Sequence, residues 1–98
     1  MAAITLDGKF YRRGIAGDPI VIISALDEGL LRDWWTENKI FTQLFEHRDP
    51  NSDIDRPAIY ISEPFANQLQ EGVAVRITID TRPEKRGTGI QIAEVAQA

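Results

Sequence analysis

Cysteine is absent from this sequence of 98 residues, and His47 is the only histidine. The chain therefore has no disulfide, no thiolate zinc site and no cysteine nucleophile, as is typical of proteins from a reducing cytoplasm. His47 is also the only imidazole available to a catalytic triad, and the segment FEHRDP places it near the end of an element, where a solvated histidine is expected. We therefore expect a cytoplasmic protein that is not an enzyme and that binds no metal or cofactor.

Long apolar runs are missing as well. No run approaches the roughly 18 residues that a membrane-spanning helix needs, and the opening residues MAAITLDGKF lack the pattern of a secretory signal. Hydrophobic residues make up 43% of the chain, which at this length is enough for one core. We expect a single domain over residues 1–98 and no contact with a membrane.

Positive charge is in the minority, and it is unevenly distributed. The formal net charge is −4. Residues 18–55 hold nine acidic side chains against three basic ones, whereas the rest of the chain has a small basic excess. An acidic middle and mildly basic ends allow one face to meet phosphates while another meets a protein.

The acidic loop DPNSDID, residues 49–55, does not predict a metal site. Its aspartates have the spacing of oxygen ligands, but the loop lacks the glycine and the distal glutamate of an EF-hand. The GTG of residues 87–89 is not a phosphate-binding loop, because no helix follows it. Both segments are expected to be turns.

Alternation and turn residues predict the elements of the N-terminal part. Ile4, Leu6 and Phe10 alternate with polar residues as in a half-buried strand, and Gly8 marks a bend or bulge within it. Residues 14–19 are predicted to turn, and residues 20–23 to form a short buried strand.

Residues 25–47 allow two interpretations. Their apolar residues fall within one arc at 100° per residue, which favours a single long helix. The stretch WTENKIFT, residues 35–42, is poor in strong helix formers, which favours a short helix over residues 25–35 and a strand over residues 39–47. We prefer the helix and strand, and the long helix remains the alternative.

The last third of the chain has the clearest order of elements. RPAIYIS predicts a strand, EPFANQLQEG a short helix that ends at Gly72, VAVRITID a regular strand, TRPEKRGTG a hairpin loop, and IQIAEV a final strand. This order over residues 56–98 resembles the closing half of the OB-fold single-stranded DNA-binding proteins of bacteria and phages. The resemblance implies a mostly β or α+β domain, a small OB-like five-stranded barrel with one or two short helices.

The resemblance also implies non-enzymatic binding of single-stranded DNA or RNA. In OB domains the loops beside the binding face supply cations and aromatic rings to a flexible strand. The candidate side chains are two tyrosines and six bases near those loops, namely Tyr11, Arg12, Arg13, Tyr60, Arg76, Arg82, Lys85 and Arg86.

Adjacent tryptophans support an alternative of another class. Trp34 and Trp35 point about 100° apart on a helix, so that one ring can fill the core while the other lies at the edge. Packing of both rings in the core is the preferred interpretation. An exposed ring among acidic residues would suit a basic protein partner or a second copy of the chain, as in a small phage or plasmid inhibitor or adaptor.

Overall fold

The structure is a computed structural model that describes residues 3–13, 15–82 and 89–98. Within these residues the chain forms six strands, two α-helices and one 3₁₀ turn. In chain order they are β1 (Ile4–Arg12), η1 (Ile15–Gly17), β2 (Pro19–Ile23), α1 (Ala25–Glu37), β3 (Glu46–Arg48), β4 (Asp55–Tyr60), α2 (Glu63–Ala66), β5 (Ala74–Thr81) and β6 (Ile90–Gln97).

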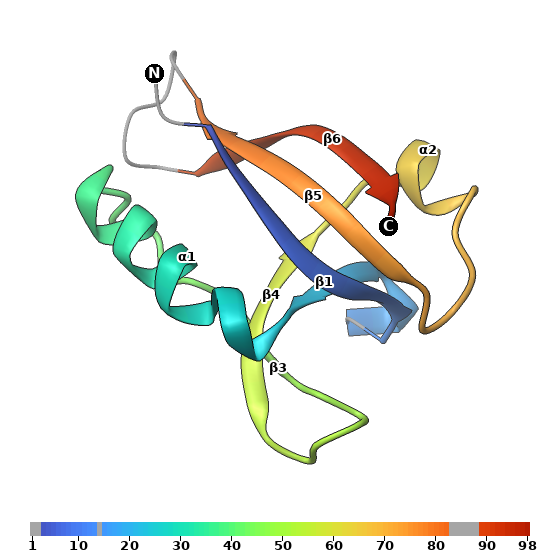
Figure 1. Cartoon of the computed structure of the whole chain (residues 1–98). Coiled ribbons are helices and arrows are strands. Elements are labelled where there is room, and N and C mark those ends of the chain that lie inside the picture. Colours follow the sequence, from blue (N-terminus) through green and yellow to red (C-terminus); the bar gives the residue numbers. More distant parts are fainter. Residues whose placement is uncertain (1–2, 14, 83–88) are drawn as a thin grey trace.

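The strands form one antiparallel sheet in the order β3-β4-β2-β1-β5-β6. Strand β1 lies between β2 and β5, and Figure 1 shows it crossing the middle of the molecule. Because β5 returns to lie beside β1, the order β5-β1-β2-β4 is that of a Greek key. The expected mostly β fold with short helices is confirmed. The described sheet has six strands and is not closed, so the five-stranded barrel is not confirmed.

Strand β2 is buried on both of its faces. Val21 and Ile23 point into the main core, together with apolar residues of β1, β4, β5 and α1. Ile20 and Ile22 point the opposite way, because successive side chains of a strand alternate between faces. They form a smaller cluster with Tyr11 and Ala58, which Phe45 covers in part. The face of the sheet that carries this smaller cluster is hereafter called the outer face.

Gly8 lets β1 lie very close to β2. A Cβ at this position would lie 2.5 Å from the carbonyl oxygen of Ile22 and 2.7 Å from Cγ1 of Val21. The strand continues through Gly8 and pairs on both sides, with Ile23 and with Val75. The glycine therefore serves a close approach of two backbones rather than the expected bend.

Helix α1 ends much earlier than the long-helix interpretation requires. Asn38 donates its side-chain amide to the carbonyl of Trp34 at 2.8 Å, and Lys39 follows with a left-handed φ of 56°. The strand expected over residues 39–47 is wrong, because the only strand there is β3. The indole N–H of Trp35 donates to the carbonyl of Thr42 at 2.7 Å, which draws this backbone towards the helix instead of a neighbouring strand.

The two helices lie at opposite ends of the molecule, with α2 near the C-terminal end of β6 (Figure 1), and both contribute side chains to the main core. In the described part of the chain, no helix is long and apolar enough to cross a membrane.

Candidate functional site

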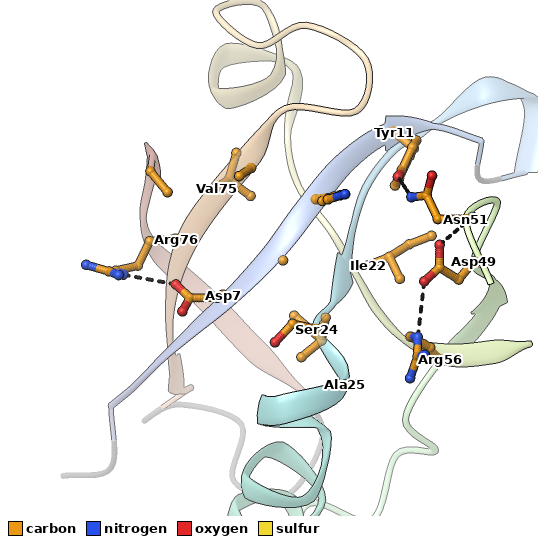
Figure 2. Close-up of a pocket in the computed structure, with 15 residues that line it drawn as sticks. Asp7, Tyr11, Ile22, Ser24, Ala25, Asp49, Asn51, Arg56, Val75 and Arg76 are labelled. Carbon is orange, nitrogen blue, oxygen red and sulfur yellow. Dashed lines mark hydrogen bonds and ion pairs between the residues drawn. The ribbon is translucent and has the colours of Figure 1, made fainter.

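A groove of about 460 Å³ lies on the outer face of the sheet, over β1. Strands β1, β2 and β5 line it together with the loop between β3 and β4. Figure 2 shows β1 running through the site, with Asp7 and Arg76 on one side and Tyr11, Asn51, Asp49 and Arg56 on the other. The groove thus collects residues from distant parts of the chain.

The floor of the groove follows from the strand register. Lys9 of β1 lies opposite Ile22 of β2 and opposite Ala74 of β5, and directly paired residues of an antiparallel sheet share a face. The floor is therefore apolar beside an ammonium group. Lys9 is exposed and has no hydrogen bond or ion pair with the described residues.

One wall of the groove is the loop that joins β3 to β4. The side-chain amide of Asn51 donates to the hydroxyl of Tyr11 at 2.5 Å. Asp49 accepts from the backbone N–H of Asn51 at 2.9 Å and from Nε of Arg56 at 3.1 Å. These bonds connect the loop to β1 and to β4, so the wall is fixed to the sheet.

Asp49 is held in its charged form. Burial alone would raise the pKa of Asp49, but the N–H of Asn51, the hydroxyl of Ser52 and the guanidinium of Arg56 together lower this pKa below its ordinary value. The carboxylate of Asp49 lies against the guanidinium of Arg56, so their two charges offset one another at this wall.

Arg56 and Asp49 belong to a larger network of charges. Arg56 also reaches Glu28 of α1 at 3.4 Å, and Arg32 pairs with Glu28 at 3.3 Å. Arg32 in turn bonds Glu46 of β3, and this bond raises the pKa of Arg32. The network ties α1, β3, β4 and the loop into one unit.

The opposite wall is an exposed ion pair between Asp7 and Arg76. Nε of Arg76 lies 3.1 Å from Oδ1 of Asp7, and both side chains are more than half exposed. The register places these two residues directly opposite one another. Pairs of this kind contribute about 0–1 kcal/mol, so Arg76 can exchange its partner easily.

The predicted bases Arg12 and Arg13 also have carboxylate partners. Arg12 lies 3.1 Å from Glu63, and the hydrogen bond with Glu63 raises the pKa of Arg12. Arg13 lies 3.1 Å from Glu71. Both pairs lie at the end of β1, beyond the groove, and the structure does not present these bases as free cations.

The remaining predicted bases lie elsewhere. Arg82 follows the end of β5, whereas Arg12 and Arg13 lie next to its beginning. The two sets are thus separated by the length of this strand, about 25 Å at 3.3 Å per residue. Lys85 and Arg86 lie outside the described residues.

The two predicted tyrosines flank Ile20 in one row across the outer face. Tyr11 pairs with Ile20 in β1–β2, and Ile20 pairs with Tyr60 in β2–β4. Tyr11 is buried, so its ring offers little surface to a base. Tyr60 is 38% exposed, and the centroid of its ring lies 4.8 Å from that of Phe45. Of the two, Tyr60 has the accessible ring.

Trp34 and Trp35 both pack inwards. Trp34 is buried in the main core, and the half-buried Trp35 packs against it, with ring centroids 6.3 Å apart. The pair therefore contributes little to the exposed surface of α1, in line with the preferred interpretation.

Sequence reasoning missed Lys9, Asn51 and Arg56 as groove residues. The alternation of β1 could have found Lys9, because it shares a face with Tyr11. No local signal marks Asn51 or Arg56, since their positions depend on how the loop folds over the sheet.

The aspartates of the acidic loop pair with arginines. Asp53 and Asp55 both pair with Arg48, while Asp49 pairs with Arg56. Within residues 3–13, 15–82 and 89–98, no three acidic or histidine side chains are grouped so as to hold a metal ion.

Comparison with known proteins adds no family. No family model matches the sequence, and neither the curated proteins nor the solved structures gave a significant match. The function must therefore be argued from the site.

Proposed function

We propose that this protein binds single-stranded nucleic acid without catalysis, and that its outer sheet face is the binding surface. The observation that carries the proposal is the groove over β1, where Lys9 lies beside an apolar floor and pairs with none of the described residues. A volume of about 460 Å³ is within the range of pockets that hold one small ligand. Such a space suits one nucleotide unit of a single strand better than a duplex.

We also propose that the sheet is an open variant of the OB barrel. Its Greek-key strand order, helix α2 between β4 and β5, and the final hairpin β5–β6 support this assignment. In OB domains the face of the second and third strands and the adjoining loops bind oligonucleotides. The proposal is supported by strand β2, which lines the groove and would be the second of these strands.

The cations around the face can bind phosphates at a small cost in ion-pair energy. The exposed pairs of Arg76, Arg12 and Arg13 each contribute about 0–1 kcal/mol, so a phosphate oxygen can replace the carboxylate. Tyr60 offers a ring for a base, and such a contact contributes roughly 1–3 kcal/mol. Arg82, Lys85 and Arg86 stay part of the proposed set of bases, and Lys85 and Arg86 lie outside the described residues.

This charge inventory predicts weak binding with a moderate dependence on salt. Three phosphate contacts, by Lys9, by Arg76 and by either Arg12 or Arg13, correspond to a slope of about −2 in a plot of log K against log salt. The affinity should then fall by about 20-fold between about 50 and 200 mM salt.

Titration of the whole protein with a fluorescent oligo-dT tests the proposal. We expect binding at about 50 mM salt, and we expect Lys9→Gln to make the slope shallower by about 0.7. Lys39→Gln is the matched control, because it removes the same charge from an exposed residue at the far end of α1. The proposal would be contradicted if oligo-dT did not bind at low salt, or if both variants lost the same affinity and salt dependence.

A protein-interaction role is the competing proposal. It relied on Trp34 and Trp35 as anchors, and both rings face the core. That role would have to use another surface of α1, where Leu26 and Leu30 are exposed.

A further inference from the structure

The exposed face of α1 carries two leucines followed by two carboxylates. Leu26 is 94% and Leu30 is 52% exposed, and Asp33 and Glu37 are exposed as well. The spacing of these four residues places them in one row along the helix. Leu31 and Trp34 point into the core instead. The four exposed residues are called the outer stripe of α1 below.

Gly29 borders the outer stripe and has no evident role within the chain. Its φ is not left-handed, and a Cβ at this position would meet no atom within 4 Å. A glycine inside a helix lowers stability relative to alanine, because it loses more backbone freedom on folding. A glycine also allows another backbone to approach closely. A partner at the stripe gives this residue a function that the isolated fold does not.

The charges of the stripe are of one sign and are not compensated within it. Asp33 and Glu37 form no ion pair with the described residues. Arg32 of the same helix lies on another face and is engaged by Glu28 and Glu46. The surface is therefore apolar at its N-terminal half and negative at its C-terminal half.

We propose that the outer stripe of α1 docks a basic amphipathic helix of another protein. Apolar residues of the partner cover Leu26 and Leu30, its backbone approaches Gly29, and its lysines or arginines meet Asp33 and Glu37. This inference is independent of nucleic-acid binding, because the stripe repels phosphates.

A second copy of the chain fits this surface poorly. Two outer stripes packed in parallel would oppose carboxylates to carboxylates, and two packed in antiparallel would oppose carboxylates to leucines. Neither arrangement supplies a base to Asp33 or Glu37. The charge pattern therefore selects a partner of different composition.

Fluorescence anisotropy with two synthetic peptides tests the proposal on the full chain. The first is an amphipathic helix of leucine and lysine, and the second has glutamate in place of each lysine. At about 50 mM salt we expect saturable binding of the leucine–lysine peptide and at least about tenfold weaker binding of the leucine–glutamate peptide.

Matched variants locate the binding. Leu30→Ala should weaken binding about fivefold, whereas Ile54→Ala, at a similarly exposed residue (51%), should leave it unchanged. Glu37→Gln should weaken binding, and Glu94→Gln, which removes an exposed carboxylate of β6, should not. Gly29→Ala should act in opposite directions, raising the Tm by about 4 °C while weakening binding.

Several outcomes would overturn the proposal. These are failure of the leucine–lysine peptide to bind, equal binding of both peptides, or equal losses for the stripe variants and their controls. Sedimentation of the free chain as a dimer that Leu26→Ala dissociates would assign the stripe to a second copy instead. Thermal unfolding of each variant shows whether a lost signal reflects lost folding.

Discussion

Arg56 and Asp49 form an ion pair that joins strand β4 to the loop preceding it. Nε of Arg56 lies 3.1 Å from Oδ2 of Asp49, and the two side chains are only 16% and 15% exposed. The pair fixes one wall of the groove, because the same aspartate also holds the backbone of Asn51. The shape of the proposed binding face therefore depends on this contact.

Replacement of Asp49 by asparagine should destabilise the protein by about 1–3 kcal/mol. The change removes one of the two carboxylates that Arg56 faces and leaves the partly buried guanidinium with Glu28 as its one ion-pair partner among the described residues. Asp53→Asn is the control, because Asp53 is 90% exposed in its pair with Arg48, so a change within about 0.5 kcal/mol is expected. Urea unfolding measures both values. Equal effects of the two variants would show that burial of the Asp49 pair is unimportant.

The same residue predicts how stability depends on pH. Asn51, Ser52 and Arg56 lower the pKa of Asp49 in the folded state, so the unfolded state binds a proton more readily. The stabilisation is complete above the ordinary pKa of aspartate, about 4, and is lost as the pH falls through the lower native pKa. The difference in unfolding free energy between wild type and Asp49→Asn should therefore narrow below about pH 4. A difference that stays constant from neutral to acidic pH would refute this assignment.

Gly8→Ala and Gly29→Ala should change stability in opposite directions. At Gly8 the new methyl group would meet the backbone of Ile22 and the side chain of Val21, so the strands must separate, at a loss of about 1–3 kcal/mol. At Gly29 it would meet no atom within 4 Å, so a gain of about 0.5–1 kcal/mol is expected. Thermal unfolding of both variants measures the two opposite changes in stability. A stabilised Gly8→Ala protein would contradict the close packing of β1 on β2.

Tyr11→Phe should loosen the loop wall of the groove. The change removes the hydroxyl that accepts a hydrogen bond from Asn51, which should lower the free energy of unfolding by about 1 kcal/mol. Tyr60→Phe is the control, because the Tyr60 hydroxyl has no hydrogen bond with the described residues. Amide hydrogen exchange of residues 49–54 should accelerate in the first variant only. Unchanged exchange would show that the Tyr11 contact does not hold the loop.

Local sequence patterns were enough to predict most elements and few of the contacts. The alternation of Val75, Ile77 and Ile79 predicted β5, and these three side chains are buried. The weak helix formers after Trp35 correctly indicated an early helix end. They did not predict a loop there, because that loop depends on the indole bond of Trp35 to Thr42 and on burial of Ile40.

The sequence by itself determined the periods of burial, the short α1 and the order of strand, helix, strand and strand at the C-terminal end. These properties arise between near neighbours in the chain, whose spacing is known in advance. Only the tertiary structure decided that Arg12 and Arg13 have carboxylate partners, that Tyr11 accepts a hydrogen bond from Asn51, and that Lys9 lies in a groove without an ion pair to any described residue. Arg13 and Glu71, for example, are 58 residues apart, and only the packing of the sheet brings their charges together.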